Sequence, residues 1–162
     1  MTLENCTQKS REAIQNAWNL VLENSNPQME QVHLLLALIQ QEDGLIPQLL
    51  KKMGVTVESL EAAAEAELRK LPGVRMSREA NAFYFSHDVE DAFTAAEKQA
   101  KTMKDEYISV EHLFLGLIDA ARGSVKELFK TYQIEKSKAL EALREVRGNQ
   151  RVTTDNPEGT YD

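Results

Sequence analysis

HLLLALI at residues 33–39 and HLFLGLI at residues 112–118 are two copies of one heptapeptide that differ at two positions, and this pair decides the fold. The correspondence extends in both directions without a gap, with about ten identities in roughly fifty aligned positions where average residue usage gives roughly three. Identical pairs outside the heptapeptide are Ala13 with Ala92, Ala17 with Ala96, Gly44 with Gly123, Leu49 with Leu128 and Lys51 with Lys130. Because most shared positions are apolar, what is repeated is a core.

Each copy is predicted to form four helices. The repeated heptapeptide is apolar nearly all round, which is typical of a buried central helix. No alternating β-branched run bounded by turn residues indicates a strand. The first helices open at the hydroxyl residues Thr7 and Ser86, which can cap a helix. The second helices start near Glu30 and Ser109 and are expected to stop at Gly44 and Gly123, where glycine can take the left-handed conformation. The third helices are expected over 47–53 and 125–132, and the fourth over 57–71 and 136–147.

The sequence therefore predicts an all-α fold of two pseudo-symmetric four-helix repeats in one compact domain. We expect repeat 1 over 1–76, repeat 2 over 77–148, and a flexible linker over 149–162 that leads toward a larger partner domain. The break at Leu71-Pro72-Gly73 separates the copies, and the last stretch is polar without periodicity.

Charge and composition exclude several classes of protein. The formal net charge of −7 and the pI of about 5.1 argue against nucleic-acid and membrane partners. The longest apolar run, 34–39, is far shorter than the roughly 20 residues that span a bilayer. A single cysteine, Cys6, excludes an internal disulfide, and the N-terminus has no apolar signal segment, so we expect a cytoplasmic location.

Residues that could carry catalysis or bind a metal do not form a site. His33 and His112 occupy equivalent repeat positions, so one structural role explains both, and a metal or haem site made from them is the weaker hypothesis. The acids beside His87 are typical of a first helical turn. Cys6 lacks a partner base, and no phosphate-binding glycine loop is present. We therefore predict that this region is not an enzyme and binds no cofactor.

The aromatic run Phe83-Tyr84-Phe85, which precedes the Ser86 cap, has two interpretations. It can staple the two repeats together, or it can form an exposed apolar patch that binds a partner. The mixed helix over 136–147 is predicted to present a solvated face.

The repeated pattern of a capped helix, then E-H-L-x-L-x-L and a glycine, resembles the Clp amino-terminal domain of Clp-family AAA+ unfoldases. The resemblance covers Leu3 to Gly148. The stretches RKLPGV at 69–74 and NPEGTYD at 156–162 resemble the ClpB (Hsp104-type) disaggregase branch.

The resemblance implies a mobile domain that recognises unfolded or aggregated polypeptides and passes them to the AAA+ hexamer. ATP and magnesium would then belong to ATPase domains beyond residue 162, and the Hsp70 system is a further candidate partner of the full-length protein. Three polar positions carry over as client-binding residues: Thr7, Asp105 and Glu111. The resemblance places an apolar groove beside them, formed by first-helix and second-helix faces.

Two departures refine the expectation. The ClpC branch has a glutamate before the histidine in both copies and holds phosphoarginine with that pair, whereas here Val32 stands opposite Glu111. This favours the disaggregase branch over the alternative, an adaptor-docking domain of a ClpC- or ClpA-type protease regulator. Positions that are groove-lining leucines elsewhere in the family hold Ala95, Gln99 and His112, so we expect a shallower or more polar groove. A purely structural spacer is the third hypothesis.

Overall fold

The computed structural model describes residues 1–74, 84–148 and 150–158 and contains eight α-helices and one short 3-10 helix over that part of the chain. The 3-10 helix is η1 (Leu3–Asn5). The first repeat holds α1 (Gln8–Glu23), α2 (Gln31–Ile39), α3 (Leu45–Lys52) and α4 (Val57–Arg69), and the second holds α5 (His87–Thr102), α6 (Val110–Ala120), α7 (Gly123–Thr131) and α8 (Lys136–Arg147). The predicted all-α fold of two four-helix repeats is confirmed. None of the described helices is both long and apolar enough to cross a bilayer.

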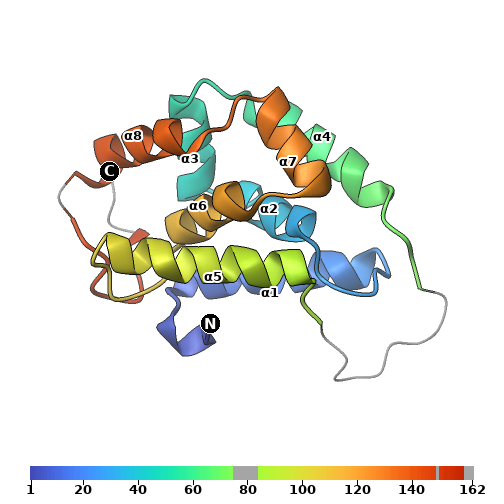
Figure 1. Ribbon diagram of the computed structural model, residues 1–162, viewed down its shortest axis with the longest axis horizontal. Coiled ribbons are helices and arrows are strands. Elements are labelled where there is room, and N and C mark those ends of the chain that lie inside the picture. The colour runs from blue at the N-terminus through green and yellow to red at the C-terminus, as the bar shows by residue number, and fades with distance from the viewer. Residues whose placement is uncertain (75–83, 149, 159–162) are drawn as a thin grey trace.

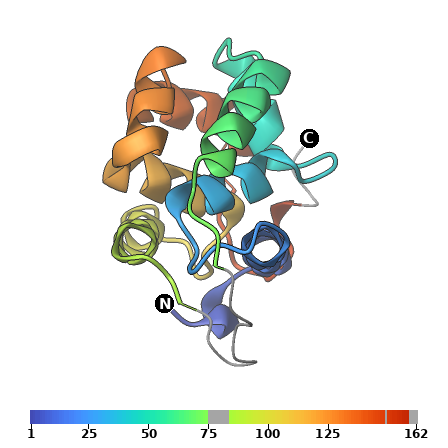
Figure 2. The same ribbon diagram turned by 90° about the vertical axis from the view of Figure 1, so that its right-hand side faces the viewer.

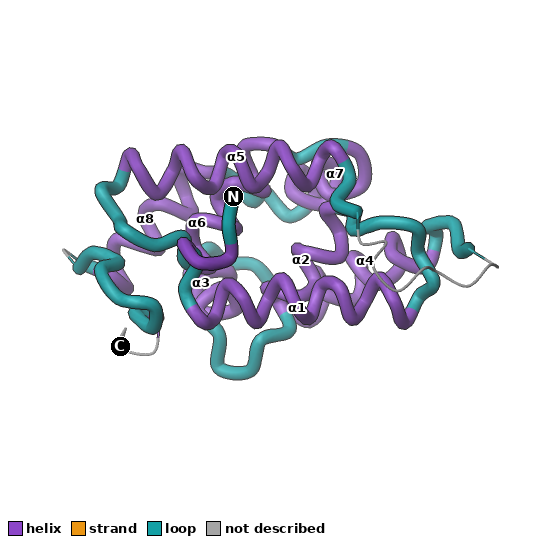
Figure 3. Tube along the Cα trace, turned by 90° about the horizontal axis from the view of Figure 1, so that it is seen from below, coloured by secondary structure: helices purple, strands orange, loops and turns teal. Residues whose placement is uncertain are grey.

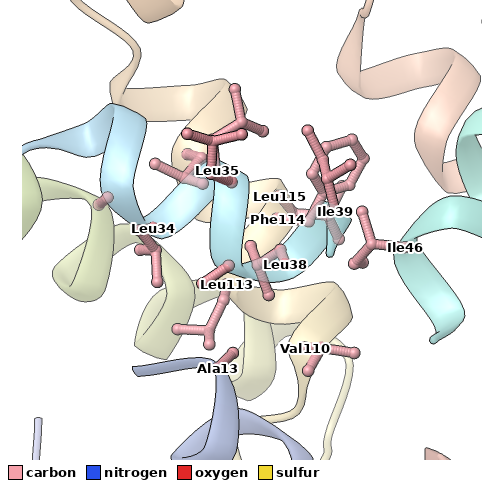
Figure 4. Packing of buried hydrophobic residues seen from close by; sticks show 14 of the residues in the cluster. Ala13, Leu34, Leu35, Leu38, Ile39, Ile46, Val110, Leu113, Phe114 and Leu115 are labelled. Carbon is pink, nitrogen blue, oxygen red and sulfur yellow. The ribbon is translucent and has the colours of Figure 1, made fainter. Parts of the chain in front are cut away.

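The helices lie in three layers. The long first helices of the two repeats, α1 and α5, run side by side along one face (Figures 1 and 3). The central helices α2 and α6 form the middle layer, and the remaining four helices cover the opposite face (Figure 2). Every residue of α2 is buried, as the repeated apolar heptapeptide predicts. In Figure 4, Leu38 of α2 and Leu113 of α6 lie in one cluster with Ala13 of α1, so the two repeats share a single core.

Two isolated β-bridges join the repeats, and each is the copy of the other. Cys6 pairs with Ile108, and Met29 pairs with Phe85. In each bridge the segment before the first helix of one repeat binds the loop before the second helix of the other. The hydrogen bonds repeat as well: Ile108 accepts from Thr7 N at 3.0 Å, and Met29 accepts from Ser86 N at 2.9 Å. The repeats therefore exchange equivalent segments, which fixes their pseudo-two-fold relation.

The predicted helix starts are largely confirmed. The Thr7 hydroxyl accepts from Ser10 N, and the Ser86 hydroxyl accepts from Val89 N, as N-caps do. Glu30 and Ser109 cap α2 and α6, each with a histidine three residues later that accepts a hydrogen bond from the cap's own backbone N–H. This capping box gives His33 and His112 the same structural role.

The prediction that Gly44 ends the second helix in a left-handed conformation is wrong. Helix α2 ends earlier, at Ile39, and Gly44 has an extended backbone (φ −75°) at the N-cap of α3. Asp43 takes the left-handed conformation instead (φ 52°), which a short polar side chain tolerates. Gly123 does have a left-handed backbone (φ 56°), but as the first residue of α7. The sequence therefore located both turns correctly, but in the first turn it did not indicate which residue takes the left-handed conformation.

Candidate functional site

An apolar groove opens between α1 and α5, the first helices of the two repeats. Its volume is about 410 Å³. Nine of the described residues line it: Met1, Leu3, Arg11, Ile14, Gln15, Trp18, Leu22, Phe85 and Phe93. In Figure 3 the two helices lie lengthwise with the N-terminal segment near one end of the space between them. The groove thus lies at the seam of the duplication.

Three aromatic rings form a row in this groove. The ring centroids of Trp18 and Phe85 are 5.0 Å apart, and those of Phe85 and Phe93 are also 5.0 Å apart, in an edge-to-face arrangement. Leu3 and Leu22 are 53% and 47% exposed, so large aliphatic side chains at the rim face solvent. Clustered exposed apolar surface of this kind is typical of a site that binds another polypeptide.

Phe85 joins the two repeats, as the first interpretation of the aromatic run expects, and it also lines the groove, whereas partner binding there stays a prediction. Its ring joins Trp18 of repeat 1 to Phe93 of repeat 2, and the same ring lines the groove. Tyr84 is 62% exposed and does not line the groove. Phe83 lies outside the described residues.

The groove differs in two respects from the expectation: Thr7, Asp105 and Glu111 do not line it, and neither do the second helices. The central helices contribute no lining residue, because their side chains are enclosed by the surrounding layers. Gln99 and His112, which the family resemblance placed in the groove, are buried, and Ala95 is half-buried. His112 points into the turn before α6 as part of its capping box and is therefore not available to the groove.

A buried polar cluster lies where α6 and α8 meet the last described residues. The Asp105 carboxylate accepts hydrogen bonds from Arg147 at 2.7 and 2.9 Å and from His112 Nε2 at 2.7 Å. The side chain of Asp105 is 0% exposed, and that of Arg147 is 5% exposed. Burial favours the neutral acid, but the bonds from His112, Arg147 and Val152 N outweigh it and hold the pKa of Asp105 far below its usual range.

Thr7 and Glu111 join the same cluster through different partners. Arg147 Nη1 lies 3.4 Å from Glu111 Oε2. The Thr7 hydroxyl donates to Glu158 Oε2 at 2.6 Å, and Val110 N donates to the same oxygen at 3.1 Å. The structure therefore brings the three predicted residues together, but all three side chains are buried.

Two residues of this cluster were missed by the sequence analysis. Arg147 was included in a helix expected to be solvated, and for this residue the prediction is wrong. Its spacing from Leu143 and Ala139, four and eight residues back along the helix, was the available signal that it shares their buried face. Glu158 lies in a segment without periodicity, where no pattern indicates burial.

The other candidates for chemistry have structural roles. In His33, Nδ1 accepts from Glu30 N at 2.9 Å and Nε2 lies 2.8 Å from Asn26 Oδ1, so both ring nitrogens are occupied. Over the described part of the chain, no group of three or more His, Cys, Asp or Glu residues is placed to hold a metal. Cys6 is fully buried, and burial raises the pKa of its thiol to about 11, opposite to what a nucleophile needs.

The chain matches a known protein family and curated relatives over most of its length. The model of the Clp repeat (R) N-terminal domain family matches residues 5–132. The chaperone protein ClpB of Clostridium tetani is 39% identical over 163 residues, an alignment that covers 100% of this chain and 19% of the relative. The chain thus spans about 19% of the length of this curated relative.

Two solved structures share the fold. The Hsp104 N-terminal domain from Candida albicans superimposes with a TM-score of 0.83 at 23% identity, covering 95% of this chain and 99% of that one. A ClpV N-domain in complex with a VipB peptide has a TM-score of 0.64 at 18% identity, covering 96% of this chain and 91% of that one. At these identities the likeness shows the fold alone.

Proposed function

The chain belongs to the Clp repeat (R) N-terminal domain family, and from this premise we propose that it is the client-recognition domain of a ClpB-type chaperone. In this role it binds apolar stretches of unfolded or aggregated polypeptides in the groove between α1 and α5. The observation that carries the proposal is the groove itself, with its aromatic row of Trp18, Phe85 and Phe93 beneath exposed leucines.

The composition of the groove supports loose selection among clients. Among the nine described lining residues, Arg11 and Gln15 have polar side chains and Trp18 adds one indole N–H, so few hydrogen bonds could select one sequence over another. Affinity would come from apolar area, which is roughly additive and tolerant of sequence. Such binding suits a domain that passes a client on to the AAA+ ring. For the full-length protein, the proposal includes an AAA+ ring that binds ATP and magnesium, and the Hsp70 system as a further partner.

Trp18 is the single tryptophan of the chain and lines the groove, so its emission reports directly on occupancy. We expect a reduced and alkylated polypeptide, permanently unfolded, to shift Trp18 emission in a saturable titration. The double variant L3S/L22S should weaken this binding about tenfold, since losing about 1.4 kcal/mol of apolar burial corresponds to that factor. Both leucines are about half exposed, so the fold should be unaffected.

Val74→Ser is the matched control. Val74 is 40% exposed but does not line the groove, so the variant should bind like the parent. Equal affinity of L3S/L22S and the parent would refute binding in this groove.

The alternative is an adaptor-docking domain, as in ClpC- or ClpA-type regulators. The ClpV N-domain complex shows that a domain of this fold can bind a VipB peptide. The two functions differ in what is recognised: a client site prefers the unfolded polypeptide, whereas an adaptor site needs a folded surface. Competition between the unfolded polypeptide and its native form separates them, and equal binding of both would count against client recognition.

The assignment of client contact to Thr7, Asp105 and Glu111 stays a prediction. Because these side chains are buried in the structure, a client can touch them only after residues near the C-terminus move away. Chemical-shift changes at these residues during the same titration would support the assignment.

A further inference from the structure

The segment 150–158 is fastened to the domain at two places. Its near end is anchored by Asp105 and its neighbour: Val152 N donates to Asp105 Oδ1 at 2.9 Å, and Glu106 N donates to Val152 O at 2.7 Å. Val152 is fully buried. Because the Asp105 carboxylate is also held by Arg147 and His112, the near end is attached to a rigid, charge-assisted network.

The far end is attached to the starts of two helices. Gln8 N donates to Asp155 O at 2.6 Å, and Val110 N donates to Glu158 Oε2 at 3.1 Å. Gln8 and Val110 are the first residues of α1 and α6, whose amides have no acceptor within their own helix. The Thr7 hydroxyl adds a third bond, to Glu158 at 2.6 Å.

The attachment at the near end has an equivalent in repeat 1. In repeat 1 the residues after α4 attach to the equivalent loop: Val74 N donates to Ser25 O at 2.7 Å, and Asn26 Nδ2 donates to Pro72 O at 3.1 Å. Asn26 is the counterpart of Asp105 in the duplication. The near end is therefore part of the repeat, whereas the far-end contacts made by Glu158 are an addition to it.

The far end contains a buried polar atom that lacks a hydrogen-bond partner in the described part of the chain, although Arg11 also lies 3.8 Å from the Asp155 carboxylate. Glu158 Oε1 is buried without a hydrogen-bond partner among the described residues. Burial raises the pKa of Glu158, and the nearby Glu111 carboxylate raises it further, against the bonds from Thr7 and Val110. An unsatisfied buried oxygen beside a like charge favours opening at this end.

We propose that residues 153–158 form a latch: Glu158 holds them on Thr7 and Val110, and its release frees them while Val152 stays anchored at Asp105. In the closed state the latch covers Thr7 and the starts of α1 and α6. In the open state these groups face solvent. Thr7 and Glu111 thus act first on the chain's own C-terminal segment.

Opening also lengthens the connection to whatever follows the domain. Six extended residues add about 20 Å of reach. If the proposed function is right, the state of the latch therefore sets the maximum distance between the client-recognition domain and the AAA+ ring. The latch itself needs no client and is tested without one.

Hydrogen exchange of the Gln8 and Val110 amides, measured on the whole chain, reports whether the latch is closed, since latch residues are their only acceptors within the described part of the chain. We expect Glu158→Ala to speed exchange of both amides at least tenfold. The Glu106 amide, which belongs to the near end, should change less than twofold. Glu158→Gln keeps an acceptor oxygen and lacks the charge beside Glu111, so it should retain the protection.

Glu141→Ala is the control, because Glu141 is an exposed carboxylate on α8 outside the cluster and should alter none of the three amides. The latch is overturned if Glu158→Ala leaves Gln8 and Val110 protected, or if the parent does not protect them. It is also overturned if Glu158→Ala speeds exchange throughout α2, because Glu158 would then be part of the cooperative fold. Failure of client binding in the Trp18 titration would leave these exchange results intact, so the two proposals can fail separately.

Discussion

His33 and His112 show how one substitution changes the chemistry of a repeated residue. Both rings accept a hydrogen bond from a helix cap at Nδ1, but Nε2 faces the neutral Asn26 in repeat 1 and the Asp105 carboxylate in repeat 2. Burial lowers the pKa of His33 to about 4, since no anion compensates for its lost hydration. The neutral ring is therefore the native form in repeat 1.

This environment predicts a pH dependence of stability. The unfolded chain takes up a proton on His33 near pH 6.5 and the folded chain only near pH 4, so the stabilisation is fully present above pH 6.5. It should fall by about 3 kcal/mol as the pH drops from 6.5 to 4. Asn26→Asp places a carboxylate where repeat 2 has one and should flatten this slope, although it removes the bond to Pro72 O.

Urea unfolding at pH 7, 6 and 5 measures this slope. His87→Gln removes an exposed histidine and is the control that should keep it. Asp105 does not contribute to this slope, because its lowered pKa changes the free energy of unfolding only below about pH 4. A parent protein equally stable at pH 5 and pH 7 would contradict the assignment to His33.

At the scale of elements, α5 and α6 approach each other more closely than a methyl group allows. A Cβ on Gly116 would lie 2.4 Å from Ala92 O and 2.8 Å from Ala96 N, both backbone atoms of α5. Repeat 1 has Ala37 at the equivalent position of α2, buried against α1. The two helix pairs are therefore packed differently despite their common pattern.

We expect Gly116→Ala to destabilise the protein by about 1–3 kcal/mol, because the helices must separate. Helix propensity alone predicts the opposite, a gain of about 1 kcal/mol. Chemical denaturation decides between them, and a more stable variant would show that the helices can move apart freely. Gly73→Ala is the control, since its Cβ would meet no atom closer than 3.8 Å.

The helices could be predicted because their cause is local. Apolar spacing and hydroxyl caps located α1, α2, α5 and α6, and the start and end of α8 were predicted to the residue. The conformation of Gly44 could not be predicted, since it depends on where α2 ends. The backbone contact at Gly116 depends on the distance between two helices, which no local pattern encodes.

At the scale of the whole molecule, the apolar groove was expected from the family resemblance, and its position differs in part from that expectation. The resemblance placed it along the first and second helices, and the structure has a groove between the first helices α1 and α5. The burial of Thr7, Asp105 and Glu111 could not be foreseen, because it depends on Arg147 and on Glu158, which is 151 residues from Thr7 in the chain. Long-range polar contacts of this kind leave no periodic signal.

The reciprocal bridges make the order of the two repeats along the chain immaterial to the packing. After α4, Val74 N donates to Ser25 O of the loop before α2, and after α8, Glu158 accepts from Thr7 at the start of α1. A circular permutant that begins at Tyr84, continues through a short linker from Glu158 into Leu3 and ends at Val74 should therefore fold to the same eight helices. Its far-ultraviolet circular dichroism should match the parent's, and its melting temperature should lie within about 5 °C, since roughly 1 kcal/mol shifts a domain of this size by a few degrees.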